Sequence, residues 1–191
     1  MSQNTPQFWL ADQQDAGAVA ACLSQLAGEL GDGAVFASTP EALAAGGFGS
    51  RPLFHCLLSG SRTEPESLAL FFPHFSTTRG CAGVYVQDLW VARTQRSLGL
   101  GQDLLAAVAD YSAHQWQARY LALSVHTSNP KALAFYRRLG FEAGEGMQAL
   151  ALTGAAFQSL TNNNSSGSSS ESITVSIRSN KVTSSQTTST N

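Results

Sequence analysis

Cysteine is scarce in this chain, and the three cysteines form no pattern. Cys22, Cys56 and Cys81 lie far apart, with no Cys-x-x-Cys pair, and the four histidines are equally scattered. A disulfide framework or a zinc site needs cysteine or histidine residues at short, regular spacing. We therefore expect reduced cysteines, no metal and a cytoplasmic protein.

Long apolar runs and an excess of positive charge are also missing. No apolar stretch is long enough to cross a bilayer, and the N-terminus lacks a basic segment followed by an apolar one. The 191 residues carry a formal net charge of −2, so no electrostatic footprint favours nucleic acid. We expect neither a membrane nor a nucleic acid as partner.

The composition changes abruptly near residue 161. From 161 to 191, serine, threonine and asparagine predominate and bulky apolar residues are few. Such a segment buries too little apolar surface to offset the entropy lost on ordering. We interpret 1–160 as a single domain and 161–191 as a disordered tail; an edge strand over 173–177 is the less favoured alternative.

Residues 1–160 alternate between strand-like and helix-like patterns. Apolar spacing and helix-start residues predict helices at 15–30, 40–47, 99–114 and 130–139. Alternating or apolar runs predict strands at 7–11, 53–58, 68–75, 83–91 and 120–126, with a closing hairpin from 141–143 and 148–153. The three central strands suit an antiparallel meander, and the whole order suits an α+β or mixed α/β fold.

The most informative segment follows the apolar run that ends at Val91. Arg96, Gly99 and Gly101 form Arg-x-x-Gly-x-Gly at the start of an amphipathic helix. Glycine lets the backbone approach an anion, and a helix N-terminus favours negative charge. The pattern predicts a pyrophosphate site. A dinucleotide site does not fit, because the glycine order differs and no acidic residue ends the strand predicted at 120–126; for this motif alone, a tight turn without ligand is the alternative.

A second motif follows that strand. Asn129 precedes Pro130 at a helix start, the helix carries Tyr136, and Leu-Gly-Phe at 139–141 ends it. In this order, the two motifs resemble those of the GNAT superfamily of N-acetyltransferases. The resemblance implies the GNAT fold, a mixed and mostly antiparallel splayed sheet flanked by helices, with acetyl-CoA as co-substrate in the splay.

The same resemblance implies contacts to acetyl-CoA. Backbone groups at the end of the predicted strand would bind the thioester and pantetheine, the glycine loop would bind the pyrophosphate, and Asn129 would bind the pantetheine arm. Tyr136 would donate a proton to the leaving thiolate, although alone it reads as an ordinary core aromatic. The residues expected to bind acetyl-CoA are Trp90, Val91, Arg96, Ser97, Leu98, Gly99, Leu100, Gly101, Asn129 and Tyr136.

The strand before the loop indicates which branch of the superfamily the chain resembles. Residues 85–91 read Tyr-Val-Gln-Asp-Leu-Trp-Val, which is similar to the diamine and polyamine branch, with its spermidine/spermine-like and thialysine-like enzymes. That likeness implies a small primary amine as acceptor (a polyamine, a diamine or a lysine-like amine), direct attack on the thioester, and a homodimer. It also implies an acidic residue near the acceptor amine, for which Glu29 is the candidate.

One departure affects the catalytic base. The branch has a glutamate where this chain has Gln87, and an amide does not accept a proton near neutral pH. Asp88 is adjacent, but successive strand residues face opposite sides unless the strand bulges. Alternatively, water or a backbone carbonyl relays the proton and Gln87 orients that water. We therefore hold Tyr136, Gln87 and Asp88 as catalytic candidates and Glu29 and Asp88 as acceptor-binding residues. A catalytically weak acyl-CoA-binding module and a protein lysine or N-terminal acetyltransferase remain alternatives.

Overall fold

The computed structural model describes residues 6–144, 151 and 153–163. Contacts divide the chain into a unit over Met1–Glu142 and another over Ala143–Asn191, and the candidate site lies in the first. Among the described residues, no helix combines the length and apolar character needed to cross a membrane.

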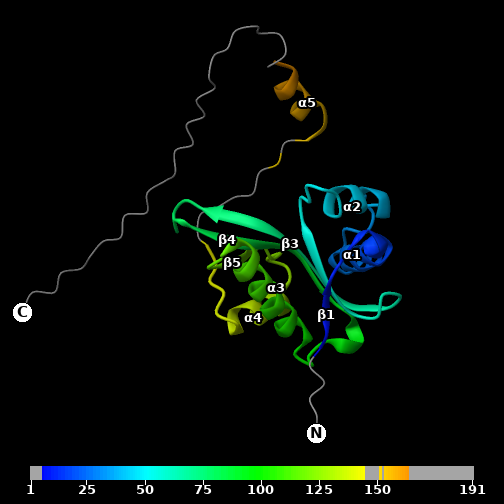
Figure 1. Cartoon of the computed structure of the whole chain (residues 1–191), viewed down its shortest axis with the longest axis vertical. Helices are drawn as coiled ribbons and strands as arrows, with labels where there is room; N and C mark the ends of the chain where they lie inside the picture. Colours follow the sequence, from blue (N-terminus) through cyan, green and yellow to red (C-terminus); the bar gives the residue numbers. More distant parts are fainter. Residues whose placement is uncertain (1–5, 145–150, 152, 164–191) are drawn as a thin grey trace, which may run out of the picture. The chain divides into compact units, whose positions relative to one another are not determined.

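A five-stranded sheet in the order β1-β2-β3-β4-β5 forms the centre of the first unit (Figure 1). The first four strands pair antiparallel, whereas β4 and β5 are parallel. The strands are β1 Phe8–Leu10, β2 His55–Gly60, β3 Pro65–Ser76, β4 Cys81–Val91 and β5 Leu121–Leu123. This confirms the mixed, mostly antiparallel sheet and the central meander predicted from the sequence.

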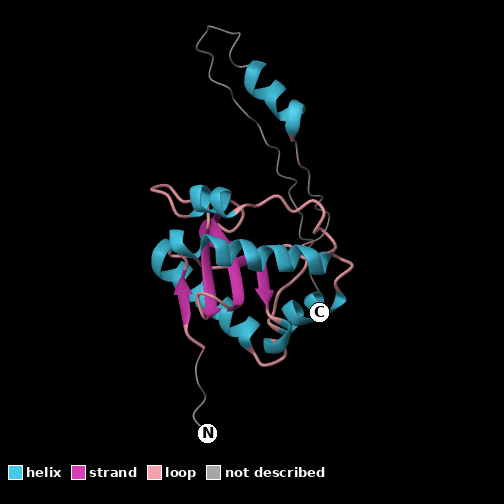
Figure 2. Ribbon diagram, turned by 90° about the vertical axis from the view of Figure 1, so that its right-hand side faces the viewer, coloured by secondary structure: helices cyan, strands magenta, loops and turns pink. Residues whose placement is uncertain are grey.

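Helices flank the sheet (Figure 2). They are α1 Ala16–Leu30, α2 Pro40–Gly47, α3 Leu100–Trp116 and α4 Pro130–Arg138, with short 3-10 turns at Gln13–Asp15 and Arg93–Gln95. Thr39 caps α2 by accepting from the Ala42 N–H, and Pro40 occupies the first turn, so α2 begins and ends where the sequence predicted.

Two apolar clusters cover the two faces of the sheet. One joins α1 and α2 to the sheet and the other joins α3 and α4 to it. Neighbouring strand residues enter opposite clusters: Leu58 packs with α1 and α2, whereas Leu57 packs with α3. The strands read as continuous apolar runs because both of their faces are covered.

A buried carboxylate anchors the start of α1. Asp15 is 2% exposed, and its side chain accepts hydrogen bonds from Trp9 Nε1, from the Asp12 N–H and, at 2.7 Å, from Arg62 Nη1. A buried charge is costly without such partners. The network therefore ties β1, α1 and the β2–β3 hairpin together and holds α1 against the sheet.

The predicted hairpin after α4 is wrong in its first strand. Residues 141–144 form no strand, because the Phe141 N–H donates to the Tyr136 carbonyl at the end of α4, where Gly140 has a φ of 88°. Ala151 and Thr153 are not in a strand either, and 148–150 and 152 lie outside the described residues.

Helix α5 (Gly154–Asn163), which the sequence patterns did not predict, spans the boundary expected at residue 160. The division into a domain and a tail therefore stays a prediction, and the edge strand considered at 173–177 lies outside the described residues. Cys22, Cys56 and Cys81 are free thiols, as expected.

The burial of His55 should make the stability of the fold depend on pH. Its ring packs among Phe71, Tyr111 and Trp116, and burial lowers the pKa of His55 from 6.5. The unfolded chain therefore binds a proton more readily, so stability is fully present above about pH 6.5 and falls as the pH drops towards the folded pKa. We expect the Tm of His55→Gln to fall less than that of the parent between about pH 7.5 and pH 5, by about 2 °C or more. Equal falls in thermal unfolding scans would contradict this.

Candidate active site

An irregularity in β4 determines which side chains reach the site. The register between β3 and β4 pairs Leu70 with Asp88 but Phe71 with Val86. Gln87 is therefore an extra residue, a β-bulge. A single extra residue shifts the alternation of every side chain that follows it in the strand.

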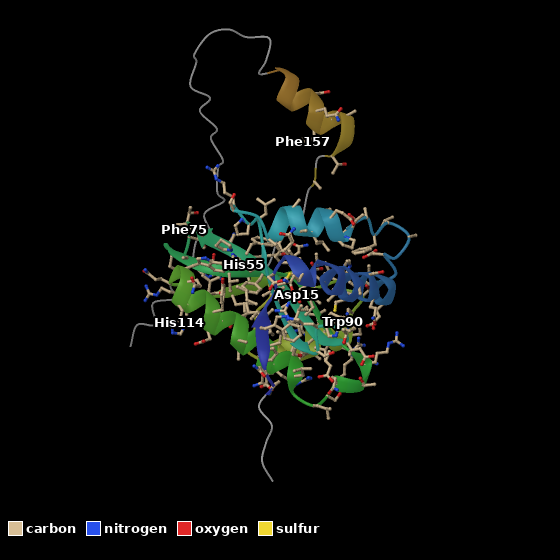
Figure 3. All side chains as sticks on the ribbon, turned by 45° about the vertical axis from the view of Figure 1, so that its right-hand side comes forward. Asp15, His55, Phe75, Trp90, His114 and Phe157 are labelled. Carbon is tan, nitrogen blue, oxygen red and sulfur yellow. The ribbon has the colours of Figure 1, made fainter. Side chains whose placement is uncertain are left out.

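The clusters on the two faces show this shift. Before the bulge, Val84 and Val86 pack in the cluster beside α3. After it, Trp90 packs with α1 and α2, whereas Leu89 packs beside α3 (Figure 3 labels Trp90). Asp88 is two residues before Trp90, so its side chain lies on the same face of the sheet, towards α1. The strand therefore has the bulge that Asp88 needs in order to face that side.

A pocket of about 520 Å³ opens on this face of the sheet. Gln87 and Asp88 both line it, so the bulge brings together two residues that regular alternation would separate. The remaining lining comes from the second half of α1, the segment that leads to α2, α2 itself, the approach to β2, and β3: Leu23, Leu26, Ala27, Leu30, Asp32, Val35, Phe36, Ala37, Ser38, Leu43, Phe54 and Leu70.

Asp88 is the carboxylate on the sheet side of this pocket. It is half-buried, and burial raises its pKa above the ordinary aspartate value. Its charge also reaches Cys56, whose thiol pKa is raised by burial first and by Asp88 second. Gln87, in contrast, is exposed. The ionisable group at the bulge is therefore Asp88, in an environment that favours its neutral form.

The end of β4 has an open edge. In the described residues, β5 pairs only with Val84–Val86, so the second half of β4 has no strand on that side. The Ala92 N–H donates to the Glu66 carbonyl, towards β3. Because backbone groups alternate along an antiparallel strand, those of Leu89 and Val91 point to the open edge.

This alternation distinguishes Trp90, one of the expected cofactor contacts, from its neighbours in the strand. The register pairs Trp90 with Leu68, so the backbone of Trp90 takes part in the β3–β4 ladder rather than facing the open edge. The backbone of Leu89, which the sequence motifs did not single out, faces the open edge together with that of Val91. Only the register between the two strands distinguishes these neighbours.

The loop after β4 has the backbone geometry of an anion site. Ser97 has a φ of 65° and Gly99 a φ of 92°, and α3 begins at Leu100 without a capping side chain. The N–H groups of Leu100 and Gly101 therefore head the helix with its positive dipole end. A non-glycine residue at positive φ is uncommon and often marks a functional segment; Leu98, between the two, is 72% exposed.

Arg96 and Glu29 form an ion pair outside the pocket. Arg96 Nη2 lies 2.6 Å from Glu29 Oε2, and Arg96 Nε donates to the Val91 carbonyl at 2.8 Å. Arg93 Nε contacts the other oxygen of Glu29 at 3.3 Å. Partial burial raises the pKa of Glu29, but the hydrogen bonds and charges of Arg96 and Arg93 outweigh it, so the net shift is downward. Glu29 does not line the pocket, so the structure does not bring it to the expected acceptor position.

Helix α4 contributes the other predicted residues. Asn129 Oδ1 caps the helix by accepting from the Ala132 N–H, which leaves the side-chain amide N–H groups to donate elsewhere. Tyr136 packs against Phe135 and Phe141 in the cluster beside α3, and burial raises its pKa. It is therefore protonated at neutral pH, on the face of the sheet opposite Asp88.

Comparisons with known proteins agree with this geometry. Residues 70–141 match the model of the Acetyltransferase (GNAT) family. The thialysine N-epsilon-acetyltransferase of Mus musculus is 31% identical over 131 residues, which are 63% of this chain and 76% of that protein. The enzyme of the same name from Bos taurus is 29% identical over 131 residues, with the same coverage of 63% and 76%.

Solved structures match the fold at low identity. An integron cassette protein from the mobile metagenome of V. cholerae has a TM-score of 0.67 at 16% identity, over 82% of this chain and 98% of that one. An aminoglycoside acetyltransferase from an uncultured soil metagenomic sample has a TM-score of 0.65 at 13% identity, over 80% and 99% of the two chains. The family model and the curated relatives define an acyltransferase, and the solved structures agree in fold. The chain belongs to the GNAT family and is an acetyl-CoA-dependent N-acetyltransferase.

Arg96 and Arg93 offer a matched pair of substitutions. Arg96 fixes the loop, because its guanidinium binds the Val91 carbonyl and the Glu29 carboxylate at the same time. We expect Arg96→Ala to weaken the Kd for acetyl-CoA about tenfold or more, measured by calorimetry. Arg93→Ala, whose side chain is 78% exposed and contacts only the Glu29 carboxylate among the described ion pairs, should change it less than about twofold. Equal effects of the two substitutions would argue against a loop-specific role.

Proposed function

We propose that the protein transfers the acetyl group of acetyl-CoA to a small primary amine by direct attack of the amine nitrogen on the thioester. The observation that carries this proposal is the bulge at Gln87. It turns Asp88 into a pocket one residue away from the Leu89 backbone at the open edge of β4. A carboxylate for the amine and a backbone edge for the thioester arm therefore adjoin each other.

The residues of the first unit fit acetyl-CoA. The open-edge backbone groups of Leu89 and Val91 suit the amide-containing pantetheine arm, and the Asn129 amide supplies a further donor. The N–H groups from Ser97 to Gly101 suit the pyrophosphate. Acetyl-CoA supplies an electrophilic thioester carbonyl and a thiolate leaving group.

Asp88 is the proposed proton acceptor. An amine attacks only as the free base, so its ammonium proton must be removed. Asp88 suits this step because burial raises its pKa, and a base with a raised pKa holds the proton more firmly once it has accepted it. Gln87 is exposed at the bulge and does not ionise, which suits it to orienting a water between the amine and Asp88.

Tyr136 is the proposed acid. In the reaction the new C–N bond forms and the C–S bond breaks, so the amine loses a proton and the sulfur gains an electron pair. Tyr136, kept protonated by its raised pKa, donates a proton to that sulfur. Asp88 and Tyr136 lie on opposite faces of the sheet, so the proposed proton acceptor and the proposed proton donor are separated from each other.

The relatives support a small amine as acceptor, since thialysine N-epsilon-acetyltransferases are among them. A homodimer, a cytoplasmic location and a domain that ends near residue 160 remain predictions.

The pH dependence of kcat/KM tests Asp88. Because the base must be ionised, the rate should rise with pH through the raised pKa of Asp88, and Asp88→Asn should remove this acid limb and lower kcat about 100-fold or more. Gln87→Glu places a carboxylate at the bulge and serves as the matched variant.

We expect Gln87→Glu alone to change kcat less than about threefold and to restore part of the activity lost in Asp88→Asn. A large gain from Gln87→Glu in the parent would instead show that the native chain lacks an effective base, which would count against Asp88.

A thiol-release assay tests the function itself. The full chain is given acetyl-CoA with spermidine, putrescine, lysine, thialysine or a lysine peptide, and we expect turnover with a small amine. Tyr136→Phe should lower kcat about tenfold or more and leave the Kd for acetyl-CoA unchanged, since only a proton is removed. Acetyl-CoA binding without turnover of any amine would favour the binding-module alternative, and preference for the peptide would favour a protein acetyltransferase.

A further inference from the structure

Most of the residues that line the acceptor pocket are apolar. Of its lining residues, the polar ones are Asp32, Ser38, Gln87 and Asp88, and none is a lysine, arginine or histidine. The apolar remainder includes two phenylalanines, Phe36 and Phe54, besides the leucines of α1. A bound molecule would therefore meet more hydrocarbon surface than hydrogen-bonding surface.

The negative charge available to a cationic acceptor is limited. Asp88 lies on the sheet side of the pocket, and Asp32 lies in the exposed loop after α1. Glu29, the acid expected to add to this charge, is paired with Arg96 and Arg93 outside the lining. Within the described residues, one half-buried carboxylate is left at the reacting end of the pocket.

Two of the lining residues also leave much of their apolar surface open to solvent. Leu30 is 40% exposed and Val35 is 77% exposed. A single exposed apolar residue needs no explanation, but two around one pocket, together with half-buried Phe36 and Phe54, form an apolar wall that a ligand would cover.

We infer that the acceptor is a primary amine with a single positive charge on an apolar body, such as an arylalkylamine; this rests on the proposed acetyl transfer. Its ammonium would meet Asp88 and its body would lie along Leu26, Phe36 and Phe54. A polyamine fits worse, because only Asp32, in the exposed loop after α1, remains for its second ammonium, which would otherwise lie among apolar side chains.

The test compares acceptors with the full chain and acetyl-CoA. We expect kcat/KM for 4-phenylbutylamine to exceed those for spermidine and thialysine by about tenfold or more. A higher value for spermidine or putrescine, or for thialysine, would overturn the inference while leaving the proposed function intact.

A pair of surface substitutions sharpens this test. Val35→Asp adds a carboxylate to the pocket wall, whereas Leu53→Asp adds the same charge at a residue that is equally exposed, at 77%, but outside the lining. We expect Val35→Asp to raise the kcat/KM ratio of spermidine to 4-phenylbutylamine about tenfold and Leu53→Asp to change it less than about twofold. Equal shifts in both variants would mean that general surface charge sets the preference, which overturns the inference.

Binding separates this inference from the proposed function. If no amine is acetylated but 4-phenylbutylamine still binds in calorimetry more tightly than spermidine, and Val35→Asp reverses that order, the acceptor class stands and acetyl transfer fails. If neither turnover nor binding of 4-phenylbutylamine is found, both fail.

Discussion

The extra residue at Gln87 is the constraint on which the site depends. A strand that crosses a two-faced sheet sends alternate side chains to opposite clusters, and without the bulge Asp88 would follow Val84 and Val86 into the cluster beside α3. A carboxylate there would be buried among valine and leucine side chains without partners. One inserted residue moves it to the pocket and returns Trp90 to the cluster with α1, so packing and chemistry are satisfied by the same irregularity.

At the end of β4, a side chain is available to the acceptor amine and neighbouring backbone groups are available to acetyl-CoA. The Asp88 side chain faces the pocket, whereas the Leu89 and Val91 backbones face the open edge. The Glu29–Arg96 pair joins the two regions, because Glu29 lies in the last turn of the helix that lines the pocket and Arg96 lies in the anion loop. Partly exposed pairs contribute little to stability, so the value of this one lies in orienting Arg96.

Periodicity and turn chemistry predict much of this fold, because they depend on neighbours in the chain. Thr39-Pro40, Asn129-Pro130 and the glycines of the loop each set a local backbone geometry, and the helices begin where these residues predict. The bulge, the outward backbone of Leu89 and the partners of Glu29 depend on register and on contacts between distant segments, which local patterns do not encode. The hairpin prediction failed for a similar reason: the Phe141 N–H is used in capping α4.

The replacement of an acidic residue by Gln87 and the apolar lining of the pocket have a common physical consequence. The resembling branch has a glutamate, followed by an aspartate, where this chain has Gln87 and Asp88. Here the bulge residue is neutral, and the remaining carboxylate at that point, Asp88, is half-buried with a raised pKa. One carboxylate neutralises one cation, and the apolar side chains beside it offer no partner to a second. An acceptor with one charged nitrogen on an apolar body therefore matches both features, whereas a polycation would leave charge uncompensated at each.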